Sequence, residues 1–203
     1  MEKLDVATEQ LYHYTEHYLS KKNSFECDFP LAKEVGLTIS QSVDKKVRTF
    51  SWDLKSGGTL HEFDSLWQYQ DQQGNVKLKS GDGHNIIDIF TAHLNDKTYY
   101  WLVDYQIGYG RLHGTTARVY QLEQRIKPVK LLKTSSLTDE IGYEFDPSSE
   151  YDLPMEKRNR LIQYDDKLKI LSLPVVVQTA EYPNGKVTNK RIEYKFDGQY
   201  FVR

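Results

Sequence analysis

The sequence predicts a mainly β protein of antiparallel strands in hairpin and meander arrangement, with one amphipathic helix at the N-terminus. From residue 37 onward, apolar and polar residues alternate with a period of two, the pattern of half-buried strands. Short clusters of Gly, Asn, Asp and Pro separate these segments, as hairpin turns do. The 15 Tyr residues fit the same fold class, because the aromatic ring fills a pleated surface while the hydroxyl stays in water.

The predicted helix covers residues 2–22. Its apolar side chains recur at spacings of three and four and therefore share one stripe of the helical surface: Leu4, Ala7, Leu11, Tyr14 and Tyr18. Neither Gly nor Pro interrupts the segment, and Lys21 and Lys22 lie at the end that favours cations. We expect this stripe to pack against the sheet.

Residues 37–203 are predicted to form the antiparallel body, and the whole chain 1–203 a single domain. The central hairpin lies within 49–70 and turns at the loop 55–58, and a second hairpin turns at Asn95-Asp96-Lys97. Other strands are expected at 37–42, 45–53, 76–79, 86–94, 98–106, 116–122 and 129–133, and in a closing meander at 160–164, 167–173, 175–182, 187–196 and 200–203. Residues 134–158 contain Pro147, Pro154 and many polar residues, and we expect an irregular, exposed segment there.

Composition excludes several classes of protein. The formal charge of -2 and the pI near 6.3 argue against nucleic-acid binding, which usually requires a clearly basic domain. No apolar run approaches the ~20 residues that a membrane-spanning helix needs. The single cysteine, Cys27, excludes an intrachain disulfide.

One motif matches a metal-binding pattern. The segment from His13 to His17 fits H-x-x-E-H, in which two histidines on one helical face bind zinc and Glu16 would act as base. The helical wheel, however, places His17 about 90° and His13 about 130° from the centre of the apolar stripe, with Glu16 nearly opposite. The trio therefore faces solvent, and we predict no metal centre and no cofactor.

Three titratable residues near glycine-rich turns form a weak catalytic candidate. Asp53 and His61 can face each other across the central hairpin as an acid–base pair, and His113 follows a second glycine-rich loop. No G-x-S-x-G nucleophile motif occurs. We favour a loop-fixing role for Asp53, whose carboxylate can accept backbone N–H groups of the turn.

Several motifs resemble those of a known group of proteins. They are Phe50-Ser51-Trp52-Asp53, then Gly57-Gly58-Thr59 and Phe63; the stretches 99–104 and 118–122; and the closing stretch 194–201. This F-S-W-D…G-G-T core resembles a family of uncharacterised bacterial secreted or periplasmic β-rich proteins. The resemblance implies a periplasmic or secreted location and brings no catalytic residues with it. Residues 1–5 lack the apolar segment of a signal peptide, so a cytoplasmic location is the alternative.

These observations favour a non-enzymatic binding protein of the bacterial envelope, specifically an immunity-type inhibitor that caps a toxin. An acidic segment would steer the protein toward a basic partner through these residues: Asp139, Glu140, Glu144, Asp146, Glu150 and Asp152. One alternative is a hydrolase, with or without a metal, that uses Asp53, His61 and His113. Another is a structural or ligand-carrying domain whose sheet encloses an apolar cavity.

Overall fold

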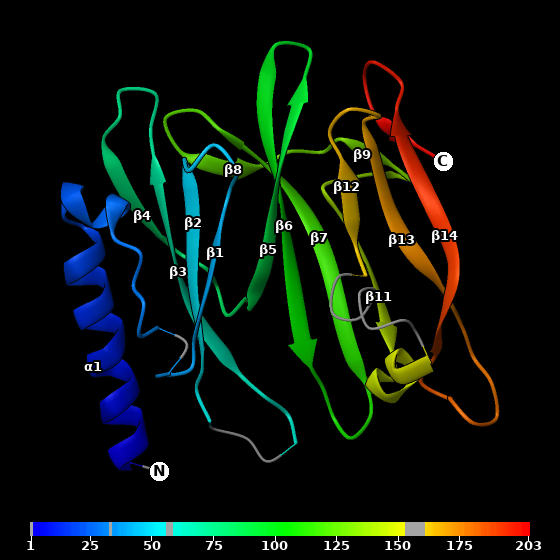
Figure 1. Ribbon diagram of the computed structural model, residues 1–203, viewed down its shortest axis with the longest axis horizontal. Helices are drawn as coiled ribbons and strands as arrows, with labels where there is room; N and C mark the ends of the chain where they lie inside the picture. Colours follow the sequence, from blue (N-terminus) through cyan, green and yellow to red (C-terminus); the bar gives the residue numbers. More distant parts are fainter. Residues whose placement is uncertain (1, 33, 56–58, 153–160) are drawn as a thin grey trace.

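The computed structural model describes residues 2–32, 34–55, 59–152 and 161–203, and for residues 2–5, 151 and 152 only the backbone. One helix and three β-sheets lie side by side in the order α1, sheet A, sheet B, sheet C (Figure 1). The predicted fold class, mainly β with antiparallel sheets and one N-terminal helix, is confirmed. Within the described ranges, no helix is both long and apolar enough to cross a membrane.

The strands of sheet A follow sequence order: β1 (Leu37–Gln41), β2 (Val47–Asp53), β3 (Phe63–Gln70) and β4 (Val76–Ser80). Sheet B has the order β11-β7-β6-β5, and β8 also pairs with β7: β5 (Ile86–Leu94), β6 (Lys97–Ile107), β7 (His113–Leu122), β8 (Ile126–Pro128) and β11 (Glu140–Phe145). Sheet C has the order β10-β9-β15-β14-β13-β12: β9 (Leu132–Lys133), β10 (Leu137–Thr138), β12 (Gln163–Asp165), β13 (Ile170–Val177), β14 (Lys186–Phe196) and β15 (Phe201–Val202). The helices are α1 (Glu2–Leu19) and the short 3₁₀ helices η1 (Lys22–Glu26) and η2 (Pro147–Asp152).

Sheet B is the middle layer and is covered on both faces. Its strand β6 is buried without interruption from Tyr99 to Asp104. Alternate residues point in opposite directions: Trp101 and Val103 enter the core shared with sheet C, whereas Tyr100 and Leu102 enter the core shared with sheet A. A third core lies between α1 and sheet A.

The two predicted hairpins are confirmed. Strands β2 and β3 pair antiparallel from Val47↔Tyr69 to Asp53↔Phe63, and residues 56–58 of their predicted loop lie outside the described residues. Strands β5 and β6 turn at Asn95 and Asp96, whose φ angles of 46° and 60° lie in the left-handed region that these residue types tolerate.

Helix α1 packs on sheet A through a different face from the predicted one, so that prediction is wrong. The residues turned toward the sheet are Thr8, Tyr12, Thr15 and Leu19. In the predicted stripe, Leu11, Tyr14 and Tyr18 are 40%, 65% and 58% exposed. The helix also ends at Leu19, before the predicted end at residue 22.

Buried polar side chains of sheet A explain this orientation. Gln68 Nε2 donates hydrogen bonds to the Leu19 carbonyl (2.6 Å) and to Ser24 Oγ (2.8 Å). Arg48, 3% exposed, donates to the carbonyls of Ser24 and Cys27, each at 2.7 Å. These bonds satisfy carbonyls at and after the helix end and thereby fix which helical face turns inward. Hydrophobic periodicity contains no signal for such contacts.

The prediction of an irregular segment over 134–158 is wrong for its first half, because β10 and β11 lie there. Strand β11 pairs with β7 over six positions, from Glu140↔Arg118 to Phe145↔His113. Gly142 permits this close pairing, since a Cβ there would lie 2.6 Å from the Thr115 carbonyl oxygen. Ile141, Tyr143 and Phe145 alternate with Glu140, Gly142 and Glu144, so the period-two signal of a strand was present in this segment and was overlooked. Residues 153–158 lie outside the described residues.

Sheet C differs from the predicted meander at two points. Pro174 was expected to separate two strands, but β13 runs through it and the register shifts between Pro174 and Val176. Proline is tolerated at such an irregularity because the backbone N–H it lacks is not needed there. At the C-terminus, β15 pairs parallel with β9 as well as antiparallel with β14. The last strand therefore joins the two halves of the sheet.

We expect Phe201→Ala to lower the free energy of unfolding by about 3–5 kcal/mol, because a fully buried aromatic side chain leaves a cavity. Phe201 is 0% exposed and its ring lies 5.3 Å from Trp101 and 5.4 Å from Phe196. Urea denaturation measures the change. The matched control is Leu168→Ala, whose side chain is 59% exposed and should cost less than ~0.5 kcal/mol. Equal losses in both variants would contradict the packing described for sheet C.

Candidate functional site

Three histidines bond to aspartates through Nδ1, and each pair joins two segments of the chain. The Nδ1–Oδ2 distances are 2.6 Å for His61–Asp53, 2.8 Å for His84–Asp104 and 2.8 Å for His93–Asp166. A carboxylate on Nδ1 fixes the tautomer and the orientation of the imidazole ring. What each pair can do chemically therefore depends on the partner of the other ring nitrogen, Nε2.

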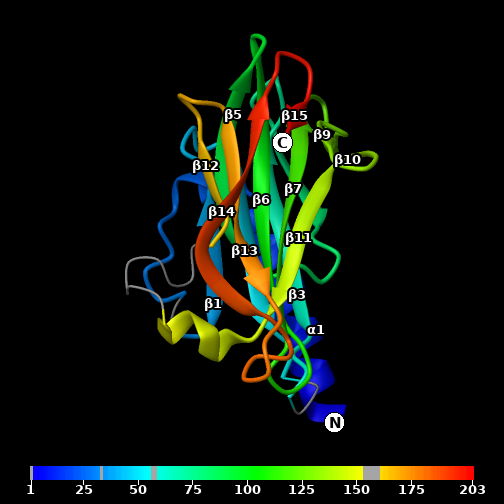
Figure 2. The same cartoon turned by 90° about the vertical axis from the view of Figure 1, so that its right-hand side faces the viewer.

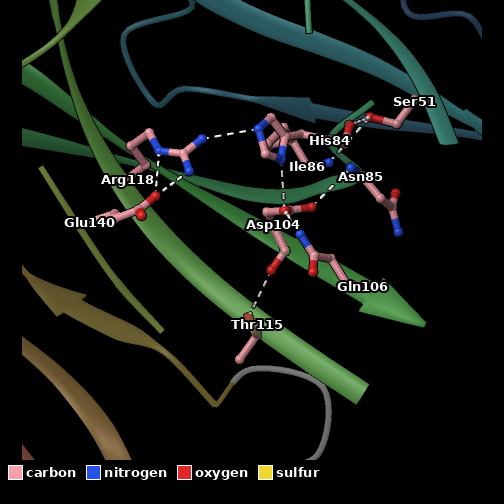
Figure 3. Close-up of polar contacts among 9 residues, drawn as sticks. All are labelled: Ser51, His84, Asn85, Ile86, Asp104, Gln106, Thr115, Arg118 and Glu140. Atoms are coloured by element: carbon pink, nitrogen blue, oxygen red, sulfur yellow. Dashed lines mark hydrogen bonds and ion pairs between the residues drawn. The ribbon is translucent and has the colours of Figure 1, made fainter. Parts of the chain in front are cut away.

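The most buried pair lies between sheets A and B (Figure 3). Asp104, on β6, is only 4% exposed, and its carboxylate accepts three hydrogen bonds. Oδ2 accepts from His84 Nδ1 and from Gln106 Nε2 (3.0 Å), and Oδ1 accepts from the Asn85 backbone N–H (2.9 Å). These bonds offset the cost of burying the charge and hold the loop before β5 against β6.

Arg118 of β7 occupies the other side of His84. Its Nη1 lies 3.0 Å from His84 Nε2, and guanidinium nitrogens only donate hydrogen bonds. His84 Nε2 therefore accepts, and the imidazole is neutral with its proton on Nδ1. Arg118 also donates through Nε to Glu140 Oε2 of β11 at 2.8 Å. Burial alone would lower the pKa of Arg118, but hydrogen bonds with Tyr120 and Glu140 outweigh burial and raise it.

The same loop is bonded to sheet A. Ser51 Oγ of β2 donates to the His84 carbonyl and accepts from the Ile86 backbone N–H, both at 3.2 Å. The cluster defined by Ser51, His84, Asp104, Arg118 and Glu140, called here the inter-sheet network, thus links β2, β6, β7 and β11 (Figure 3). The sequence of contacts from Asp104 to His84 resembles the carboxylate–histidine part of a catalytic triad. In a triad, however, Nε2 of the histidine would face a nucleophile that loses a proton, and here it faces the guanidinium of Arg118. His84 cannot act as a general base in this arrangement.

Sequence reasoning missed the inter-sheet network. Asp104 carried a signal, because it shares a strand face with the apolar Tyr100 and Leu102. A carboxylate on such a face is either buried with polar partners or lies where the covered part of the face ends. Its partners His84 and Arg118 come from other segments, and no local pattern marks them.

The predicted trio of Asp53, His61 and His113 is partly brought together. His61 bonds to Asp53, and Asp53 Oδ1 also accepts the Lys55 backbone N–H at 2.8 Å, which agrees with the expected loop-fixing role. Burial alone would raise the pKa of Asp53, but the hydrogen bonds from Lys55 and His61 outweigh it and lower the pKa. The His61 side chain is 36% exposed.

His113 lies near this pair but bonds elsewhere. The His61 N–H donates to the carbonyl of Ile107 (3.2 Å), and Ile107 pairs with His113 in sheet B. The ring of His113, however, places Nδ1 2.7 Å from Tyr105 Oη. Burial and nearby Glu150 raise the pKa of Tyr105 to about 12, so its hydroxyl keeps its proton and donates it to His113. Burial is also the main cause that lowers the pKa of His113, and His61 lowers it further.

The metal candidates remain on the exposed part of α1. The side chain of His13 is 65% exposed and lies 3.8 Å from Glu9 and 3.9 Å from Glu16. His17 is exposed as well. In the portion of the chain that the structure describes, no three His, Cys, Asp or Glu side chains gather as metal ligands would.

The acidic segment is largely engaged within the protein. Glu140 pairs with Arg118, and Asp146 is 1% exposed and pairs with Arg111 at 2.9 Å. Burial alone would raise the pKa of Asp146, but hydrogen bonds from Ser148 and Arg111 lower it. Glu150 is buried too, and the side chain of Asp152 lies outside the described residues. The partner-binding role of the six acidic residues stays a prediction; among those whose side chains are described, Glu144 is exposed and Asp139 is half-buried.

The hollow between sheets B and C is small. It is lined in part by Ile87, Val103, Tyr105 and Ile162 and has a volume of about 10 Å³. A space of that size holds about one water molecule. An apolar ligand of ordinary size does not fit there. The larger hollows, such as one of about 840 Å³ between β5 and β12, are open grooves on the surface.

We expect the ring of His84 to be neutral with its proton on Nδ1 at neutral pH, and ¹⁵N NMR of the histidine rings measures this directly. Arg118→Met should shift the Nε2 signal of His84, because Nε2 loses its donor, while Nδ1 stays protonated beside Asp104. His93 is the control: it bonds to Asp166 and no described arginine contacts it, so its signals should not move. An imidazolium, or a proton on Nε2, in the wild type would contradict the network.

Comparison with known protein families, with curated proteins and with solved structures finds no match to this chain. We therefore base the binding role on the contacts, burial and charges of the side chains, and the location on the resemblance of the F-S-W-D…G-G-T core.

Proposed function

We propose that this protein is a non-enzymatic binding protein of the bacterial envelope, and specifically an immunity-type inhibitor that caps a basic surface of a toxin. The envelope location rests on the resemblance of the F-S-W-D…G-G-T core to secreted or periplasmic β-rich proteins. The binding role rests on the edge strand β11. The non-enzymatic role rests on the hydrogen bonds that His84 and His113 make within the protein.

Strand β11 is the observation that carries the proposal. It is the last strand of sheet B on its side and, among the described residues, pairs only with β7 (Figure 2). An unpaired strand edge offers backbone N–H and C=O groups to an incoming chain. Glu140, Gly142 and Glu144 are exposed along it; Glu140 pairs with Arg118, so the acidic character of this edge rests on Glu144. A basic partner is therefore favoured over an acidic one.

The histidines support the absence of catalysis. His84 bonds to Asp104 and Arg118, and His113 bonds to Tyr105, so the nitrogens of these partly buried imidazoles connect separate segments of the chain. The salt bridge between Arg111 and Asp146 fixes the chain directly after the edge strand β11. Such contacts hold β11 and the segment after it in place, which suits a binding edge that is formed before the partner arrives.

Affinity capture from the native host tests this proposal, with wild type, Glu144→Lys and Glu34→Lys as baits. We expect a stoichiometric basic protein on the wild type, with at least about tenfold weaker binding to Glu144→Lys, because the charge on the β11 edge is reversed. Glu34 is exposed on the connection before β1, so Glu34→Lys makes the same charge change away from sheet B and should bind normally. No stoichiometric partner, or equal loss in both variants, would refute the proposal.

A second candidate function rests on the Asp53–His61 pair. Its Nδ1–Oδ2 distance of 2.6 Å and the 36% exposure of His61 resemble an acid–base dyad that a substrate can reach. His113 begins β7 of sheet B opposite Ile107, whose carbonyl accepts from the His61 backbone N–H, although the His113 ring bonds to Tyr105. This arrangement would support hydrolysis by general-base activation of water.

Hydrolysis of p-nitrophenyl esters of acetate and phosphate separates the two candidates. For the dyad, His61→Gln should lower the rate by about 10²-fold or more. His93→Gln removes the similar but more exposed His93–Asp166 pair and should leave the rate unchanged. Rates for the wild type that equal those of His61→Gln would end the hydrolase candidate.

A further inference from the structure

One flank of α1 carries an apolar seam that does not pack on sheet A, and at its end Lys21 Nζ lies 4.7 Å from the centroid of the Tyr18 ring. The helix faces sheet A with Thr8, Tyr12, Thr15 and Leu19; Leu19 is 1% exposed, and the Tyr12 ring lies 6.1 Å from Trp52. At 100° per residue, these positions are about 90° from the centre of the stripe formed by Ala7, Leu11, Tyr14 and Tyr18. The stripe therefore lies along the side of the helix, beside the surface of sheet A.

The seam has the spacing of a coiled coil. Its residues follow one another at intervals of four, three and four, so Leu11 and Tyr18 fall at a positions and Ala7 and Tyr14 at d positions of a heptad. Ala7 is exposed, and Leu11, Tyr14 and Tyr18 are 40%, 65% and 58% exposed. Such a seam is the surface that a second helix covers.

We propose that a second copy of this chain covers the seam, with the two α1 helices side by side and antiparallel. In antiparallel coiled coils an a residue meets a d residue of the other helix. Ala7 of one copy then faces Tyr18 of the other, and Leu11 faces Tyr14, so each larger side chain meets a smaller one. A parallel pair would set Tyr18 against Tyr18 and Ala7 against Ala7, which crowds one layer and leaves a gap in another.

Charge along the helix favours the same direction. The first half contains Glu2, Asp5 and Glu9 with only Lys3, whereas Lys21 and Lys22 follow the helix end. An antiparallel pair brings the acidic half of each copy next to the basic end of the other. A parallel pair brings like charges together. The antiparallel dimer should therefore weaken as salt concentration rises.

The seam is short, and this sets the expected strength. Two heptads bury much less than the roughly 1,600 Å² of a typical stable interface. A dissociation constant in the micromolar range or weaker is expected for such a contact. The dimer contact on α1 does not involve the β11 edge of sheet B. The test of the dimer and the test of a partner at β11 are therefore independent of each other.

Sedimentation velocity of the full chain, from about 1 to 500 µM, tests the proposal. We expect a monomer–dimer equilibrium in the wild type. Leu11→Glu should weaken it at least about tenfold, because a carboxylate enters the centre of the seam. Val6→Glu is the matched control: Val6 is 49% exposed and lies about 110° around α1 from the seam, on the side away from sheet A, so the dimer should persist. A monomer at every concentration, or equal weakening by both variants, would overturn the proposal.

Cross-linking tests the direction of the pair, in a Cys27→Ser background that removes the exposed native thiol. Ala7→Cys combined with Tyr18→Cys should form disulfide-linked dimers on mild oxidation. Ala7→Cys alone should remain monomeric under the same conditions. Cross-linking of Ala7→Cys alone would show a parallel pair and overturn the antiparallel arrangement. Circular dichroism of each variant checks that the helix and sheets are retained.

Discussion

The structure depends on the burial of both faces of sheet B. Strand β6 carries Trp101 and Val103 on one face and Tyr100 and Leu102 on the other, and all four are at most 3% exposed. Each such side chain contributes about 1.5–3 kcal/mol when it leaves water, so neither face can remain uncovered. Sheet A covers one face and sheet C the other, and α1 then covers the outer face of sheet A.

The same constraint explains the polar chemistry. Because β6 is covered on both faces, Asp104 is buried with it, and an unpaired buried carboxylate would be costly. His84, Gln106 and the Asn85 backbone supply the donors, and Arg118 and Glu140 complete the chain of contacts. A group of residues that resembles catalytic machinery in type is therefore occupied by hydrogen bonds within the fold. We regard these residues as the means by which sheet B and its edge strand β11 are kept rigid, as the proposed binding role requires.

Local patterns predicted what depends on neighbours in the chain. The alternation along β6 and the turn at Asn95 and Asp96 were sufficient for that hairpin, and Asp53 was placed beside His61 because both flank one turn. Contacts between distant segments were not predictable in this way. Arg118 and Glu140 lie 22 residues apart, and Arg48 and Gln68 reach the end of α1 from sheet A. Glu140 and Asp146 are engaged because Arg118 and Arg111 come from other segments. The predicted helical stripe stays outside because Arg48 and Gln68 bond at the end of α1 and turn another face of the helix inward.

Native-state hydrogen exchange tests the central position of sheet B most directly. If both of its faces are covered, the amides of β6 from Tyr100 to Val103 exchange only through global unfolding and are the slowest in the protein. The amides of the outer strand β12 and of α1 should exchange faster, through local opening. Exchange of the β6 amides as fast as those of β12 would mean that sheet B is open to solvent on one side and would contradict the account.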